Sequence, residues 1–196
     1  MLRDLVALFY RLSRGPAMSI AAPFDRYQGE VLAEWIDANG HMNLAYYTVL
    51  FDYAADLLFE AIGIGQSYKR ATNHGTFVVE THNLYARELL IGERVRVVSQ
   101  ILGADDKRLH LAHEMFRLAD GQRAAMQELM FVSIDLSRRR VVPFLDEVQR
   151  HVAAAAAAHA HLPIPHWAGR YIAMPPGARS NAIGPQRRGL GGPSDR

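Results

Sequence analysis

The stretch of sequence that decides the fold runs Trp35-Ile36-Asp37-Ala38-Asn39-Gly40-His41-Met42-Asn43. Before it, residues 27–35 have the pattern of a strand, and its polar, glycine-containing middle is typical of a turn. After it, residues 44–62 contain neither Pro nor Gly, and their apolar side chains recur at helical spacing. Asn43 is a preferred N-cap residue, and Gly63 stands where glycine commonly ends a helix. The stretch therefore predicts a strand, a turn and one long helix in direct succession.

The period of the apolar residues changes after Gly75, from helical spacing to alternation. Separators that contain Gly or Asp, as hairpins do, divide the following sequence into four extended segments, at about residues 76–90, 93–103, 107–119 and 122–136. No strand–helix–strand alternation of the parallel kind is present. The order predicts an α+β fold in which one long helix covers one antiparallel sheet.

The two ends of the chain differ in composition from residues 20–150, which we predict to form a single domain. Residues 1–19 are an expected appendage, for which a short surface helix and a true start at Met18 are both open interpretations. Residues 151–196 are expected to hold an Ala-rich helix, because alanine is the best helix former. From Leu162 onward the chain is rich in Pro, Gly and Arg, which predicts a mostly disordered tail.

Composition excludes several classes of protein. Apolar residues make up 49% of the chain and charged residues 21%, which is enough to bury a normal core. The absence of cysteine excludes disulfides, thiolate metal sites and cysteine nucleophiles. No apolar run approaches the roughly 20 residues of a membrane span, and the apolar stretch near residue 5 lacks the features of a secretory signal. We therefore expect a cytoplasmic protein that does not associate with membranes.

The net charge of +2 is unevenly distributed along the chain. Residues 1–19 carry +2 and residues 160–196 carry +4, which leaves −4 on the central body. A nucleic-acid-binding protein needs a basic surface across its folded domain, so this distribution argues against nucleic acid as a partner.

Asp37 stands shortly before the predicted start of the helix, beside Gly40 and His41. A helix N-terminus offers unpaired backbone N–H groups and a positive partial charge, which together stabilise a developing oxyanion. A carboxylate beside it can act as nucleophile or general base, and Gly40 lets the backbone approach a substrate closely. Judged from the spacing alone, the favoured alternative is that Asp37 and Asn39 only form the turn and cap the helix.

The same stretch and the residues that follow it, Tyr46, Tyr47, Phe51 and Asp52, together resemble the signature of hotdog-fold acyl-CoA thioesterases of the 4-hydroxybenzoyl-CoA thioesterase type. That signature is Asp-x-x-Gly-His-(Val/Met)-Asn-Asn-x-x-Tyr and then an aromatic–acidic pair, and the order of elements over residues 24–150 agrees with it. Leu44 departs from it, since it replaces the second Asn. The resemblance implies a hotdog fold, a curved antiparallel sheet wrapped around one long helix, and hydrolysis of an acyl-CoA thioester. It implies no metal and no cofactor, because CoA enters as part of the substrate.

The resemblance also implies roles for individual residues. Asp37 is the expected catalytic carboxylate, and the backbone N–H groups from Gly40 to Asn43 are expected to polarise the thioester carbonyl. His41 is expected to orient Asp37 or to touch the substrate, with a structural bond across the turn as the alternative. Tyr47 is a candidate for lining the acyl pocket, with packing beneath the helix as the favoured alternative.

A narrower resemblance rests on the run Phe-Val-Val-Glu-Thr-His at residues 77–82, together with residues 85–89 and 105–110. These are similar to the betainyl-CoA thioesterases linked to bacterial carnitine breakdown. Glu80 and His82 share one face of a strand, so they are candidates for binding the acyl head or holding the water; a solvated strand face is an equal alternative. A betaine head is a quaternary ammonium, which aromatic rings bind by cation–π attraction. Trp35 is a candidate ring, although rings beside an apolar helix are usually core.

The sequence leaves a second class of function open, a non-catalytic acyl-CoA or small-ligand binding protein on the same fold. A hotdog dehydratase is not favoured, since its His-centred motif is missing. A single antiparallel sheet leaves a strand edge uncovered, so we expect a homodimer or homotetramer. The resemblance implies that active sites form at the subunit interface, and Asp52 is expected to serve that interface or the fold.

Other polar groups carry weaker signals. His110 and His113 fall on opposite faces of a strand and make a poor pair of metal ligands. His159 and His161 are expected to lie in a solvated tail, so no metal site is predicted. Residues 138–140 are three arginines that could contact CoA phosphates, with a solvent-facing turn as the favoured alternative.

Overall fold

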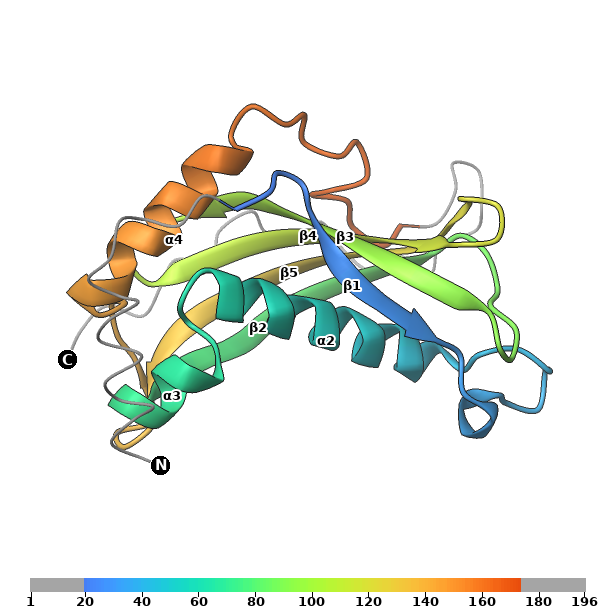
Figure 1. The fold of residues 1–196 in the computed structure, drawn as a ribbon, viewed down its shortest axis with the longest axis horizontal. Helices are drawn as coiled ribbons and strands as arrows, with labels where there is room; N and C mark the ends of the chain where they lie inside the picture. The colour runs from blue at the N-terminus through green and yellow to red at the C-terminus, as the bar shows by residue number, and fades with distance from the viewer. Residues whose placement is uncertain (1–19, 174–196) are drawn as a thin grey trace.

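The computed structural model describes residues 20–173, and the expectations for residues 1–19 and 174–196 lie outside this range. A curved antiparallel sheet wraps around one long helix, α2 (Leu44–Ala61), as Figure 1 shows. The strands lie in the order β1-β3-β4-β5-β2, with β6 paired to β5. Their bounds are Phe24–Glu30 (β1), His74–Tyr85 (β2), Arg94–Ala104 (β3), Arg108–Arg117 (β4), Arg123–Asp135 (β5) and Arg140–Val141 (β6). The predicted α+β fold, with one sheet around one long helix, is confirmed.

α2 begins where the sequence predicts it. The Asn43 side chain accepts the Ala45 N–H at 3.0 Å and so caps the helix. The helix packs against the sheet through side chains that are almost fully buried: Tyr47, Leu50, Phe51, Ala54, Ala55, Leu58 and Phe59. They divide between two core clusters, one with Met42 near the start of α2 and one around Leu58 near its end. This apolar face holds the helix, and therefore the turn before it, firmly against the sheet.

The sequence pattern misses two short helical segments. Residues 31–35, predicted as the end of a strand, leave the sheet and form a 3₁₀ turn, η1 (Ala33–Trp35). α3 (Gln66–Thr72) is too short to show a helical period, and it ends on Asn73, which has a left-handed φ of 56°. β2 also ends earlier than predicted, at Tyr85, because the chain beyond it turns toward the start of α2. There the Met42 N–H donates to the Leu89 carbonyl at 2.8 Å.

α4 (Asp146–His159) follows β6 and packs against β3. Val148, Val152 and other buried side chains of this helix join the core cluster around the end of α2. His159, expected to be solvated, is instead buried, and its Nδ1 accepts the Ile101 N–H at 3.2 Å. Burial lowers the pKa of His159. The Ala-rich helix is therefore part of the folded body.

Residues 160–173, which we call the C-terminal strap, run back across the sheet on the face opposite α2 (Figure 1). Trp167 is only 1% exposed, packs with Ala112 and Met126, and donates its indole N–H to Glu114 at 3.2 Å. The prediction of disorder from Leu162 is therefore wrong for residues 162–173. The segment is rich in Pro and Gly, which is typical of disorder, but the burial of the Trp167 side chain fixes it to the sheet.

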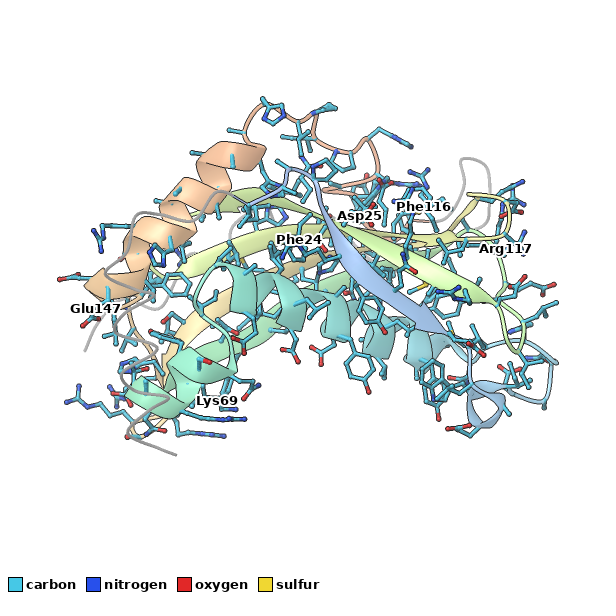
Figure 2. The ribbon with its side chains drawn as sticks, viewed as in Figure 1. Phe24, Asp25, Lys69, Phe116, Arg117 and Glu147 are labelled. Carbon is cyan, nitrogen blue, oxygen red and sulfur yellow. The ribbon has the colours of Figure 1, made fainter. Side chains whose placement is uncertain are left out.

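The sheet thus has a concave face toward α2 and a convex face that carries the C-terminal strap. On the convex side, Arg96 pairs with Asp25 at 2.9 Å, and its guanidinium lies over the Phe116 ring (Figure 2). α3 and α4, marked by Lys69 and Glu147 in Figure 2, lie at the end of the molecule where α2 finishes. The turn that precedes α2 lies at the other end. Within residues 20–173, no helix has both the length and the apolar composition that crossing a bilayer requires.

Candidate active site

Asp37 lies in a tight turn that backbone hydrogen bonds close. The Asp37 N–H donates to the His41 carbonyl at 3.0 Å. The residues that flank this pair, Ile36 and Met42, form an antiparallel β-bridge with each other. Gly40 has a φ of +82°, a left-handed conformation that residues with a Cβ rarely adopt. The turn therefore fixes the position of Asp37 shortly before the start of α2.

The Asp37 carboxylate is held by one oxygen and open at the other. Its Oδ1 accepts the Asn39 N–H at 2.8 Å and lies 4.0 Å from His41 Nδ1. Its Oδ2 has no partner among residues 20–173, and 22% of the side chain is exposed. The His41 Nδ1 also lies 3.3 Å from the Met42 carbonyl. The structure thus brings Asp37 and His41 together and leaves one carboxylate oxygen free for a substrate or a water.

The backbone N–H groups around the turn are mostly in use. Gly40 donates to the Asp37 carbonyl at 3.0 Å, and Asn43 donates to the Trp35 carbonyl at 2.9 Å. Of the N–H groups from Gly40 to Asn43 that are expected to polarise a substrate, those of Gly40, Met42 and Asn43 are thus used within the fold, and the role of this stretch toward a substrate stays a prediction. Within the described part of the chain, the N–H groups of His41 and Leu44 find no acceptor. These two donors, at the positive end of an 18-residue helix, are the ones that can meet an oxyanion.

The aromatic residues near the turn have two different roles. Trp35 stacks on Tyr46 with ring centroids 5.1 Å apart and an interplanar angle of 12°, and both rings are half-buried. Tyr47 is buried, lies edge-on to Tyr85, and donates its hydroxyl to the Arg87 carbonyl at 3.3 Å. Burial raises the pKa of Tyr47 to about 12. Tyr47 therefore packs beneath the helix, whereas Trp35 and Tyr46 offer a partly open aromatic surface beside the turn.

Glu80 and His82 do not join Asp37. The next residue of the strand, Asn83, faces the helix, because its Nδ2 donates to the Thr48 hydroxyl of α2 at 3.3 Å. Because neighbouring side chains of a strand alternate, His82 faces the convex side. There Glu80 and His82 line a cavity of about 390 Å³ together with His110, Glu128 and residues 169–171 of the C-terminal strap. Within one copy of the chain, the two residues are thus separated from Asp37 by the sheet.

The part of the chain that forms this turn, the long helix and most of the sheet matches the sequence model of a protein family. Residues 31–152, more than half of the chain, match the Thioesterase-like superfamily. The chain belongs to this superfamily. The assignment to the hotdog-fold acyl-CoA thioesterases that the turn sequence predicted is therefore confirmed.

Two relatives with similar sequences align with more than three quarters of this chain. A betainyl-CoA thioesterase of Pseudomonas aeruginosa is 41% identical over 150 residues, which cover 76% of this chain and 94% of that protein. An L-carnitine dehydrogenase/betainyl-CoA thioesterase of Rhizobium meliloti is 31% identical over 174 residues, covering 88% of this chain but only 35% of that longer protein.

Solved structures agree with the family assignment. A hypothetical protein of Staphylococcus aureus, solved in complex with CoA, superposes with a TM-score of 0.72 at 26% identity and covers 81% of this chain and 100% of its own. A putative thioesterase of Pseudomonas putida gives a TM-score of 0.67 at 31% identity and covers 79% and 99%. The curved sheet around one helix is thus the hotdog fold.

The sequence pattern did not single out three residues at and near the start of α2 as site candidates: Leu44, Thr48 and Asn83. Leu44 stands where the family signature has Asn, and its backbone N–H finds no acceptor among residues 20–173. Thr48 follows one helical turn later and Asn83 meets it from β2, a contact that only the paired sheet reveals. Asp52, a further turn along, has its pKa raised by burial and by the nearby Asp56. Among residues 20–173, no three or more His, Cys, Asp or Glu side chains are placed so that they could hold a metal ion together.

Proposed function

We propose that this chain hydrolyses the thioester bond of a short acyl-CoA, with Asp37 as its catalytic carboxylate. The observation that supports this best is the geometry at the start of α2, where the closed turn holds Asp37 with its Oδ2 open, and the N–H groups of His41 and Leu44 find no acceptor among residues 20–173. A protein that only binds acyl-CoA has no need of a carboxylate at this position.

The reaction follows from these groups. The thioester carbonyl oxygen accepts hydrogen bonds from the His41 and Leu44 N–H groups, and the helix dipole stabilises the negative charge that develops on it. The Asp37 carboxylate either attacks the carbonyl carbon, giving an anhydride that water then opens, or takes a proton from the attacking water. In both routes the C–S bond breaks and the CoA thiolate leaves and is protonated. The products are one carboxylic acid and one free thiol.

The acyl group that we propose is betainyl, the group named for the 41% identical relative. Trp35 and Tyr46 present aromatic faces beside the turn, and such faces attract a quaternary ammonium. The net charge of −4 on the central body also favours a cationic acyl group. Glu80 and His82 are left out of the substrate site because they face the convex side. The reaction would serve carnitine breakdown in the cytoplasm.

The assembly that we propose is a homodimer formed through the free edge of β2, with a homotetramer of two such dimers as the next size. β2 ends the strand order, and its side chains Phe77, Val78 and Val79 are 39%, 45% and 59% exposed. An exposed apolar strand edge is a site for pairing with another chain. A second copy there would cover this edge and the start of α2 beside it, which places the active site at the interface.

A thiol-release assay with a panel of acyl-CoAs tests the activity. Betainyl-, acetyl-, hexanoyl-, palmitoyl- and benzoyl-CoA are compared by kcat/KM, with light scattering on the same sample to measure the mass in solution. Release of CoA from betainyl-CoA ahead of the others supports the proposal. Tight binding of acyl-CoA without release would instead identify a binding protein.

A further inference from the structure

A row of polar side chains crosses the concave face of the sheet beneath α2. Ser99, His113 and Gln127 are directly paired on β3, β4 and β5, and Gln127 is paired in turn with Asn83 of β2. The first three are at most 1% exposed. The row ends at the helix, where Asn83 donates to Thr48. We call these five residues the polar row.

The polar row has two bonded ends and an unbonded middle. His113 Nδ1 lies 2.8 Å from the Ser99 hydroxyl at the inner end, and Asn83 Nδ2 lies 3.3 Å from the Thr48 hydroxyl at the outer end. Between them, four buried atoms have no partner in the described structure: His113 Nε2, Gln127 Nε2, Gln127 Oε1 and Asn83 Oδ1. A buried polar group left unpaired destabilises the fold, so a core of this kind needs small rotations or waters that link its members.

The members of the polar row can be linked in either of two directions. Each of the five side chains can donate at one atom and accept at another, and His113 is neutral because burial lowers its pKa to about 3. In one direction every donor points from Ser99 toward Thr48, and the Thr48 O–H is free to donate at the outer end of the row. In the other, the Thr48 O–H turns inward to Asn83, the His113 Nδ1–H donates to Ser99, and oxygen lone pairs face outward. A cation at the outer end favours the second direction.

The outer end of the polar row lies within reach of an acyl group at the proposed site. Thr48 stands four residues after Leu44 and therefore on the same side of α2, about 6 Å along the axis. A thioester whose carbonyl oxygen meets the Leu44 N–H can place an acyl head two or three bonds long beside Thr48 and Asn83. The Tyr85 hydroxyl, 3.5 Å from the Leu44 carbonyl, bounds the same region.

We propose that the polar row determines specificity, favouring a short acyl group with a cationic head over a hydrocarbon of the same shape, with Asn83 and Thr48 as its contact residues. This inference rests on the proposed function. Gln127, His113 and Ser99 are positioning residues, since they act on the substrate only through the direction of the Asn83 amide and the Thr48 hydroxyl.

The test compares betainyl-CoA with 3,3-dimethylbutyryl-CoA, in which a neutral carbon replaces the quaternary nitrogen. We measure kcat/KM for both with wild type, Gln127→Leu and Asn83→Leu. The matched control is Gln100→Leu, the same change on β3 one position from Ser99, where the side chain faces the convex side and contacts Pro163. We expect the preference for betainyl to fall about tenfold in Gln127→Leu and Asn83→Leu, because the cationic head loses its electrostatic attraction to the oriented oxygens of the row, and to stay within about twofold in Gln100→Leu.

A preference that stays unchanged in both Gln127→Leu and Asn83→Leu overturns the inference while leaving the thioesterase proposal intact. No thiol release from any acyl-CoA overturns the proposed function itself. Because a core variant can fail to fold, a second measurement uses the ¹⁵N shifts of His113 in Asp37→Asn saturated with betainyl-CoA. We expect the Nδ1–H tautomer in that complex, and an Nε2–H tautomer would contradict the polar row's proposed direction.

Discussion

The Asn43 N–H donates to the Trp35 carbonyl at 2.9 Å, so the residue that caps α2 is bonded to the residue that ends η1. This bond joins the two ends of the segment 35–43, and Asp37 lies between them. The position of the carboxylate relative to the helix N-terminus is therefore set by backbone geometry. Substitutions of the Asp37 side chain should accordingly change the chemistry and leave the backbone of the turn in place.

Asp37→Asn should retain the fold and lose most of the activity. The amide keeps the size of the carboxylate and can still accept the Asn39 N–H, but it can neither attack a carbonyl nor take a proton. Loss of one such group costs on the order of 10²–10⁴ in rate. Thiol release measures kcat, and the midpoint of urea unfolding checks the fold. Near-wild-type turnover in this variant would remove Asp37 from the catalytic role.

Gly40→Ala should lower both stability and activity through the backbone alone. A Cβ at Gly40 would meet no atom within 4 Å, but φ is +82°, which costs an L residue about 1–2 kcal/mol. Gly103→Ala is the control, because its Cβ also meets nothing and its φ is not positive. Urea unfolding should show the loss only in Gly40→Ala. An equal loss of unfolding free energy in the two variants would mean that a Cβ at position 40 does not strain the turn.

The fold could be predicted because its decisive signals are local. The cap at Asn43 and the helical period after it fix α2, and alternation with hairpin separators fixes the sheet. The free donors could not be predicted, since finding that Asn43 is engaged and Leu44 is not requires the three-dimensional closure of the turn. The same holds for Glu80 and His82: a strand pattern shows that they share a face, but only pairing with β5 and the contact of Asn83 with α2 show which face it is.

Trp167→Ala should destabilise the protein by about 3–5 kcal/mol, the usual cost of removing a fully buried large aromatic side chain. The indole also donates to Glu114, which would lose that partner. The activity of the folded fraction should remain, because the C-terminal strap lies on the convex face, away from Asp37. Ile164→Ala, in the same strap but 71% exposed, is the control and should change stability little. A normal unfolding free energy for Trp167→Ala would mean that the strap does not stabilise the fold.

His113 should make stability fall with acid. Burial lowers the pKa of His113 in the folded protein to about 3, whereas the unfolded chain binds a proton near the ordinary value of 6.5. Its contribution is therefore complete above pH 6.5 and is lost as pH falls toward 3, with a slope of up to about 1.4 kcal/mol per pH unit. Urea unfolding between about pH 7 and about pH 5 should show a shallower dependence for His113→Gln than for wild type. A slope in His113→Gln equal to that of wild type would contradict the assignment.

Trp35→Leu should reduce the preference for a cationic acyl group. The Trp35 ring stacks on Tyr46 and is only partly buried, so we expect it to lie against a quaternary ammonium whose thioester is bound at the start of α2. A cation–π contact contributes about 0.5–2 kcal/mol, which corresponds to roughly a 2- to 30-fold change in the ratio of kcat/KM for betainyl-CoA to that for 3,3-dimethylbutyryl-CoA. The control is Tyr53→Leu, which removes a ring of α2 that packs near Tyr27. It should leave the ratio of the two kcat/KM values unchanged. If Trp35→Leu keeps the wild-type ratio while Asn83→Leu lowers it, the selection comes from the polar row rather than from the aromatic surface.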